Sequence, residues 1–153
     1  MGALPGILPL TTPAGISSAA AVSRVKRYLP RGTKIGHAGT LDPFATGVLL
    51  LLIGSATKRC ESLMDLPKQY EATVRFGATT ATNDLNSPVQ PVAGAVMPTA
   101  SAIAAALAKF IGTVMQRPPA YSALKVGGRR AYDLARKGQT VELQPRPVRI
   151  DRI

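Results

Sequence analysis

The apolar residues in the first half of the chain form two kinds of pattern, short continuous runs and helix-like spacings. A short extended segment is expected near residues 6–10, followed by a helix at about 18–29 in which apolar residues recur every three or four positions. Ser17 is the expected N-cap, because its side-chain oxygen can accept a hydrogen bond from the first turn. The unbroken apolar run Val48–Ile53, bounded by two glycines, predicts a buried strand, and a second helix is expected over 55–66.

The second half of the chain mixes alternating and Ala-rich stretches. Residues 70–76 alternate apolar and polar side chains and therefore predict a strand, while 77–96 is a loop rich in Thr, Asn and Pro. The Ala-rich stretch 99–110 predicts a helix, since Ala has the highest helix propensity. Strands and helices follow one another without a regular strand–helix–strand rhythm, so the predicted fold class is α+β. The remaining expected elements are extended segments at 113–117 and 122–126, a short helix at 130–137 and a strand region at 141–153.

Charge is the most unusual property of the composition. The 153 residues, of which 46% are hydrophobic, suffice for one domain with a core. Nineteen Lys and Arg oppose eight Asp and Glu, and this net charge of +11 favours an anionic partner such as RNA, bound in a salt-dependent way. A solvated basic surface is the ordinary alternative. Five basic residues precede the first acidic one: Arg24, Lys26, Arg27, Arg31 and Lys34.

One cysteine and one histidine limit the chemistry that the chain can perform. A single cysteine excludes an internal disulfide, and the two residues are too few for a zinc site of nitrogen and sulfur ligands. Cys60 is expected to be a small packing residue of the second helix. The apolar N-terminus carries three prolines and no basic residue, so no export signal is expected, and the run Val48–Ile53 is too short to cross a bilayer. The sequence thus predicts a cytoplasmic protein without a metal ion or cofactor.

Residues 36–49 carry the clearest chemical signal, and they read Gly-His-Ala-Gly-Thr-Leu-Asp-Pro-Phe-Ala-Thr-Gly-Val-Leu. They bring the only histidine, an acidic residue and three glycines into a turn-rich loop before the buried strand. Asp42 is the candidate nucleophile, because a carboxylate can attack a sugar carbon or an activated base ring without a cofactor. Its structural alternative is the cap of an Asp-Pro turn. His37 is a candidate for binding a base, although a lone histidine is more often structural.

Two further segments offer features that suit nucleic acid. Tyr70 could stack on a base that has left its helix, or it could be an ordinary core aromatic of the predicted strand. Residues 119–138 combine a Gly pair with basic side chains suited to phosphate contacts, or they form a plain basic hairpin and helix. The basic residues of this segment are Lys125, Arg129, Arg130, Arg136 and Lys137.

The segments 36–49 and 119–138, with the Lys-Gln-Tyr sequence that ends at Tyr70, closely resemble the TruB family of tRNA pseudouridine-55 synthases. The resemblance implies an α+β domain around a mixed, mainly antiparallel sheet with flanking helices. It implies isomerisation of uridine 55 in the T-loop of tRNA, without a cofactor. In that family the residue matching Asp42 is the nucleophile, the one matching His37 binds substrate, and the tyrosine stacks on the uracil. The basic segment would be a clamp over the RNA, with Lys125, Arg129, Arg130 and Arg136 as its contacts.

The resemblance covers nearly the whole chain, with several departures. Thr11 and Thr12 stand where the family has an Asp-Lys pair, and Ala81 occupies a position that is usually acidic. The chain stops at Ile153, before the family strand whose arginine pairs with the nucleophile and before the C-terminal RNA-binding PUA domain. We therefore expect residues 1–153 to be a partial catalytic domain that is weakly active or inactive alone.

Two alternative functions stay open at this point. One is a guide-dependent, dyskerin-like RNA pseudouridine synthase, against which the clamp sequence Tyr-Ser-Ala-Leu-Lys favours the stand-alone bacterial branch. The other is a non-catalytic RNA-binding module, which would bind RNA without forming product. The expected oligomeric state is a monomer, and the order in which Asp42 would attack ribose and base stays open.

Overall fold

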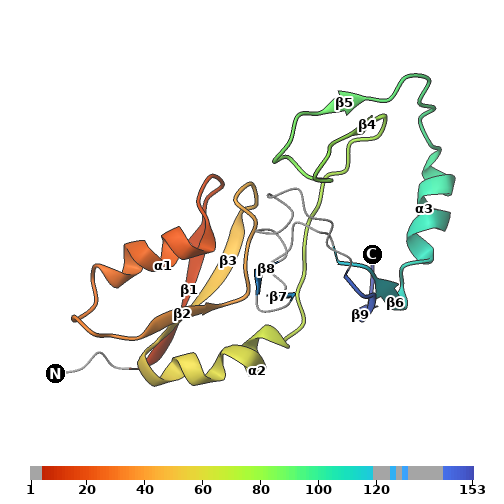
Figure 1. Ribbon diagram of the computed structural model, residues 1–153. Coiled ribbons are helices and arrows are strands. Elements are labelled where there is room, and N and C mark those ends of the chain that lie inside the picture. Colours follow the sequence, from red (N-terminus) through yellow and green to blue (C-terminus); the bar gives the residue numbers. More distant parts are fainter. Residues whose placement is uncertain (1–4, 119–124, 127–128, 131–142) are drawn as a thin grey trace. The chain divides into compact units, whose positions relative to one another are not determined.

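The computed structural model describes residues 5–118, 125–126, 129–130 and 143–153. The chain divides into two compact units, Met1–Val74 and Arg75–Ile153, called here the first and second unit. Helices and antiparallel strands occur together, which confirms the predicted α+β class (Figure 1). Every strand pair in the described part of the chain is antiparallel. Among these residues no helix combines the length and the apolar character needed to cross a membrane.

A three-stranded sheet forms the frame of the first unit. Strand β3 (Gly47–Ile53) lies in the middle, with β1 (Gly6–Thr12) along one edge and β2 (Ile35–Ala38) along the other. The predicted apolar strand is thus confirmed, and its central place explains its composition. Strand β3 has a neighbour along each edge, and buried leucines lie on both of its faces, Leu49 and Leu51 on one and Leu52 on the other, so polar alternation is lost. Leu49, Leu51 and Leu52 are at most 1% exposed, and each such burial contributes about 2 kcal/mol.

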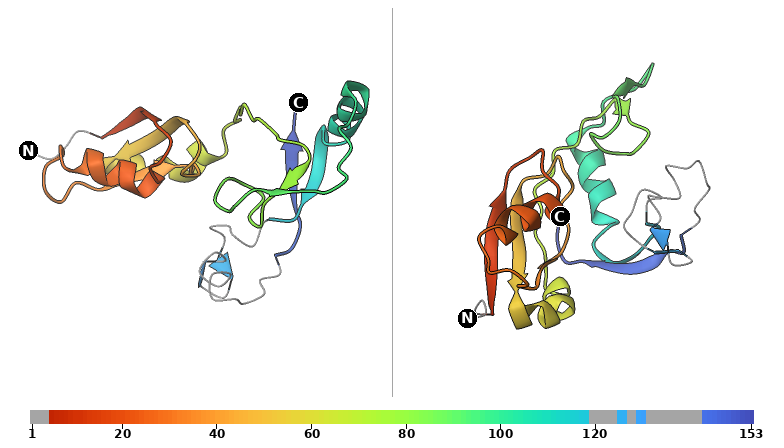
Figure 2. Two further views of the ribbon diagram at one scale, coloured as in Figure 1. Left: turned by 90° about the horizontal axis from the view of Figure 1, so that it is seen from above. Right: turned by 60° about the vertical axis from the view of Figure 1, so that its left-hand side comes forward.

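Helix α1 (Ser18–Lys26) covers one face of this sheet, where Ala21 packs with Leu49 and Leu51 (Figure 2). Ser17 is its N-cap, as predicted: the Ser17 hydroxyl accepts a hydrogen bond of 3.2 Å from the Ala20 N–H. The helix ends three residues before the expected boundary. After Lys26 the backbone tightens into turns, since Tyr28 donates to the carbonyl three residues back.

The predicted helix over 55–66 is present in two parts. A 3-10 segment, η1 (Gly54–Arg59), comes first and the short helix α2 (Cys60–Met64) follows. The Thr57 hydroxyl donates to the Gly54 carbonyl at 2.9 Å, which is an alternative to the regular α-helical pattern. Helix α2 lies beside β2, and the Cys60 thiol donates to the carbonyl of His37 at 3.4 Å.

The prediction of a strand over residues 70–76 is wrong. Residues 67–75 have no regular secondary structure, and Tyr70 is 74% exposed. Alternation of apolar and polar residues produces a strand only where a neighbouring strand can accept its backbone hydrogen bonds. No described strand pairs with this segment.

The second unit consists of short paired strands and one helix. Strands β4 (Ala78–Thr79) and β5 (Gln90–Pro91) pair within the segment predicted as a loop, and β6 (Gly112–Gln116) pairs with β9 (Arg146–Ile150). The expected extended segments 113–117 and 141–153 are therefore confirmed in their central parts. Pro147 is compatible with β9 because β9 pairs with a single neighbour, so one edge needs no donor.

Helix α3 (Ala100–Ala108) confirms the helix predicted over 99–110, with Thr99 as its N-cap. The Thr99 hydroxyl accepts from the Ala102 N–H at 3.2 Å. None of its residues is buried, although the helix is almost entirely apolar. Strands β7 (Lys125–Val126) and β8 (Arg129–Arg130) pair with each other, and the short helix expected over 130–137 lies almost wholly outside the described residues.

Candidate active site

Asp42 lies in the connection between β2 and β3, at the first position of a tight turn. The Ala45 N–H donates to the Asp42 carbonyl at 2.9 Å, and Pro43 occupies the second position, where its fixed φ favours the turn. A glycine lies at each end of this stretch: Gly39, the first residue after β2, has φ +98°, and Gly47, the first residue of β3, has φ +148°. Residues with a Cβ atom rarely adopt these backbone angles, which explains why glycine occurs at both positions.

The turn is held by the first residue of α1 and by the segment that precedes this helix. The Ser18 hydroxyl accepts from the Leu41 N–H at 3.0 Å and donates to the Leu41 carbonyl at 3.4 Å. On the other side of Asp42, the Gly15 N–H donates to the Pro43 carbonyl at 2.6 Å. The backbone is thus fixed on both sides of the candidate nucleophile by residues more than twenty positions earlier in the chain.

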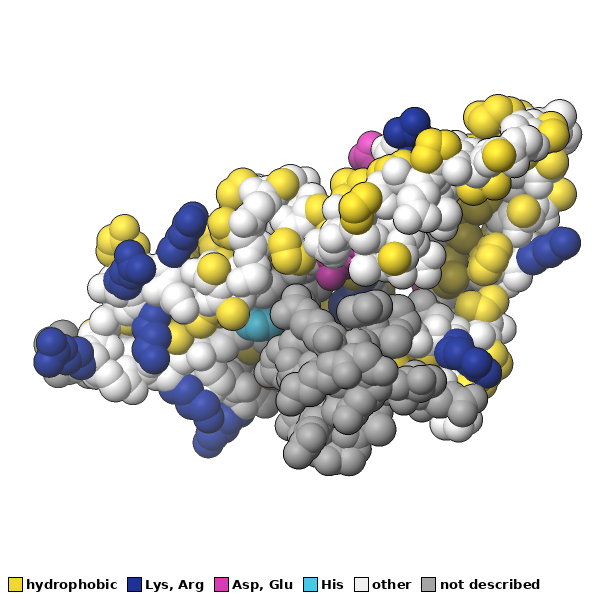
Figure 3. Space-filling view, turned by 45° about the horizontal axis from the view of Figure 1, so that its top comes forward, with side chains coloured by type: hydrophobic (Ala, Val, Ile, Leu, Met, Phe, Trp, Pro, Cys, Tyr) yellow, Lys and Arg dark blue, Asp and Glu magenta, His cyan; other side chains and the backbone are white. Residues whose placement is uncertain are grey.

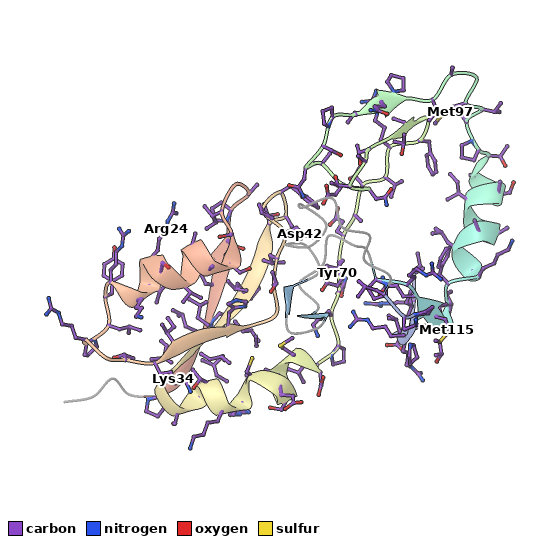
Figure 4. All side chains as sticks on the ribbon, in the orientation of Figure 1. Arg24, Lys34, Asp42, Tyr70, Met97 and Met115 are labelled. Atoms are coloured by element: carbon purple, nitrogen blue, oxygen red, sulfur yellow. The ribbon has the colours of Figure 1, made fainter. Side chains whose placement is uncertain are left out.

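The side chain of Asp42 is exposed, in contrast to its anchored backbone (Figure 4). Within the described part of the chain, no side chain forms a hydrogen bond or ion pair with its carboxylate. An exposed carboxylate on a fixed turn suits attack on an electrophilic carbon, because the geometry is set before substrate arrives. The structural alternative, an Asx cap of the turn, is not what these contacts show: the turn is closed by the Asp42 carbonyl, not by its side chain.

His37 lies on strand β2, opposite Leu51 of β3, and not in a loop as the sequence suggested. It is half-buried, and its ring reaches the surface of the first unit (Figure 3). The Nδ1 atom contacts the carbonyl of Gly39, which orients the ring at the start of the connection that carries Asp42. Because a carbonyl oxygen can only accept, Nδ1 is the donor in this contact.

Tyr70 is the other predicted site residue of the first unit. Tyr70 is in the irregular segment after α2, and no described contact joins it to Asp42 or His37. In the hairpin of β7 and β8, Lys125 pairs with Arg130 and Arg129 with Val126. Arg136 lies outside the described residues.

No group of three or more His, Cys, Asp or Glu with the geometry of a metal site occurs among the residues that the structure describes.

The sequence did not reveal that Thr12, Gly15 and Ser18 contact the backbone around Asp42. These residues belong to the region of family resemblance, which could have singled them out. Their contacts with the Asp42 turn join residues far apart in the sequence, so no local pattern predicts them. The Thr12 hydroxyl also takes part, donating to the Gly47 carbonyl at 3.1 Å.

The chain thus combines an α+β fold, a strongly basic composition and a carboxylate on an anchored turn. Comparisons with known proteins place a chain with these features in one family. A family model described as the N-terminal domain of TruB family pseudouridylate synthases matches residues 26–153. The chain belongs to the TruB family.

Individual relatives carry the name tRNA pseudouridine synthase B. The protein of Gluconacetobacter diazotrophicus is 48% identical over 147 residues, covering 96% of this chain and 47% of that protein. The protein of Mycobacterium tuberculosis is 48% identical over 97% of this chain and 49% of its own length. That of Chelativorans is 46% identical over 99% of this chain and 48% of its own length. The chain spans about half the length of these curated relatives.

Proposed function

We propose that this chain provides the nucleophile-bearing part of a tRNA pseudouridine-55 synthase. The observation that carries the proposal is Asp42, an exposed carboxylate on a turn fixed on both sides, in a member of a pseudouridylate synthase family. The relatives named above are tRNA pseudouridine synthases, which supports tRNA as the substrate. Within tRNA we propose the T-loop uridine, in agreement with the family resemblance.

The reaction is an isomerisation within one nucleotide. The bond between uracil N1 and ribose C1′ breaks, and a bond between uracil C5 and C1′ forms. The C5 proton is released and N1 gains a proton, so no oxidant or reductant is needed. Asp42 would form a transient bond with ribose C1′ or with the base ring, and this bond breaks again as uracil C5 bonds to C1′, so that the carboxylate is regenerated. A carboxylate is sufficient for this chemistry, consistent with the expectation that no cofactor takes part.

The other predicted residues would bind RNA. His37, oriented at the start of the Asp42 connection, would hold the everted nucleotide, and Tyr70 would stack on the uracil. In the predicted clamp, the β7–β8 hairpin sets two basic residues at opposite positions, which suits a phosphate partner. The proposed clamp residues are Lys125, Arg129, Arg130 and Arg136.

We further propose that residues 1–153 act as the front part of a catalytic domain. The support is that the chain covers only 47–49% of the first-named relatives. On this proposal, full activity needs residues equivalent to the remaining half of those proteins, including the PUA domain implied by the resemblance. A tRNA-modifying enzyme would act in the cytoplasm, and we propose a monomer.

The test is release of tritium from tRNA labelled at uridine C5, without guide RNA. It is run with the 153-residue chain and with the same residues followed by the C-terminal half of the Gluconacetobacter relative. The extended protein should release tritium, and Asp42→Asn should lower the rate at least about a thousandfold while tRNA binding is retained. Asp65→Asn is the matched control, because Asp65 is an exposed carboxylate at the end of α2.

Each alternative function has its own outcome in this assay. Release of tritium only after a guide RNA is added would support the dyskerin-like synthase. Binding of tRNA in a filter assay without any product, in both proteins, would support the RNA-binding module. Unchanged activity of Asp42→Asn would refute the proposed nucleophile.

A further inference from the structure

Ser18 is buried, although it is a small polar residue at the start of a helix. It is 5% exposed, whereas its neighbour Ser17, the N-cap, is exposed. The Ser18 hydroxyl makes two hydrogen bonds to one residue, Leu41, which is 23 positions away in the sequence. Helix capping is already performed by Ser17 and does not explain this arrangement.

We propose that Ser18 is a positioning residue for the reaction: its hydroxyl fixes the backbone of Leu41 and thereby the place of the Asp42 carboxylate. This inference rests on the proposed function of Asp42 as nucleophile. Ser18 does not touch the substrate in this proposal, and it acts only through the backbone next to Asp42.

The contacts around Leu41 make the hydroxyl a rigid link. The Ser18 hydroxyl satisfies both the N–H and the C=O of Leu41, at 3.0 and 3.4 Å. Because Ser18 is buried, water cannot easily replace these bonds if the hydroxyl is removed. The Leu41 side chain packs against the cluster of Ala21, Leu49 and Leu51, so its backbone and its side chain are both held.

The helix also connects the turn with the buried core of the first unit. Ser18 is the first residue of α1, and Ala21 of the same helix is 1% exposed in the core. Movement of Leu41 relative to Ser18 would therefore require movement of a packed helix. Since displacement of a catalytic group by about 1 Å can cost a hundredfold in rate, this link affects turnover more than binding.

The test compares Ser18→Ala with Ser23→Ala, a change at an exposed serine of the same helix, in the extended protein and in the 153-residue chain. Both changes remove one hydroxyl from α1, and Ala keeps the helix at either position because both serines lie within it. Only Ser18→Ala removes the link to Leu41. It should speed amide hydrogen exchange at Leu41 at least tenfold and lower kcat ten- to hundredfold, with KM unchanged. Ser23→Ala should leave both the exchange at Leu41 and kcat within about twofold.

The outcomes separate this proposal from the proposed function. Unchanged exchange at Leu41 and unchanged kcat in Ser18→Ala would overturn the positioning role, and so would a change in KM alone. If neither wild-type protein releases tritium, the proposed function fails, while the exchange rate at Leu41 still decides whether Ser18 holds the turn. If Ser18→Ala does not fold, Ser18→Cys replaces it; its thiol is a weaker hydrogen-bonding group and should give an intermediate exchange rate and kcat.

Discussion

Asp84 is the residue whose hydrogen bonds most clearly favour one charge state. Its carboxylate accepts from the Thr82 hydroxyl at 2.6 Å, from the Asn86 N–H at 2.8 Å and from the Asn86 side-chain amide at 2.6 Å. These bonds, led by that of Thr82, lower the pKa of Asp84 below its ordinary value, although partial burial opposes the shift. They close the loop between β4 and β5, where Asn83 has a positive φ of 58°.

A pH dependence follows from this shift. Because the folded-state pKa is lower than the unfolded value of about 3.9, the carboxylate stabilises the fold at pH values above the unfolded pKa. That contribution is lost as the pH falls through the folded pKa. Asp84→Asn should therefore lower the free energy of unfolding at pH 7 and have a smaller effect near pH 2. Urea denaturation at both pH values measures this, and an equal difference at the two pH values would contradict it.

At the scale of elements, the sequence was most informative where one pattern determines one structure. The strand over 48–53 was predictable because a run of six apolar residues between glycines is typical of a short buried strand. Helix α1 was predictable because the N-cap residue and the apolar spacing indicate the same helix start. Strand β2 was missed, since Gly-His-Ala carries no apolar alternation and is ordered by pairing with β3. The strand over 70–76 failed for the opposite reason: its local pattern was right but a pairing partner was lacking in the described structure. The motif made Asp42 and His37 candidates, whereas the hydrogen bonds of Ser18 to Leu41 are a tertiary contact that no local pattern reveals.

The packing of α1 on β3 should dominate the stability of the first unit. Leu51 is 0% exposed and belongs to the core cluster, so Leu51→Ala removes buried apolar surface and leaves a cavity. We expect the free energy of unfolding to fall by about 3 kcal/mol. Val48→Ala on the same strand is the control, because Val48 is 63% exposed and should change stability by less than about 1 kcal/mol. Urea unfolding followed by amide NMR signals of β3 measures both, and equal losses would refute the argument.

For the whole molecule, the excess of basic residues predicts how RNA binding responds to salt. The net charge of +11 should make tRNA affinity fall steeply as the salt concentration rises about fourfold, from about 50 to about 200 mM. The reason is that bound counterions are released from the RNA when the protein binds. If the β7–β8 hairpin contacts phosphates, the double change Arg129→Ala with Arg130→Ala should reduce the slope of log affinity against log salt by up to about 2.

Arg149→Ala provides the control for this experiment. Arg149 forms an ion pair of 2.8 Å with Asp151, so its charge is already engaged within the chain. Its removal should leave the salt slope unchanged in filter-binding measurements. Equal slopes for the hairpin variant and the wild-type protein would exclude the hairpin from the RNA interface.

The only cysteine of the chain provides a built-in probe of the candidate site. The Cys60 thiol donates to the carbonyl of His37, on the strand that leads into the Asp42 connection. A fluorophore or spin label attached through maleimide chemistry would therefore enter at one defined position without prior mutagenesis. Its signal would report on the strand beside the candidate Asp42 turn when RNA is added.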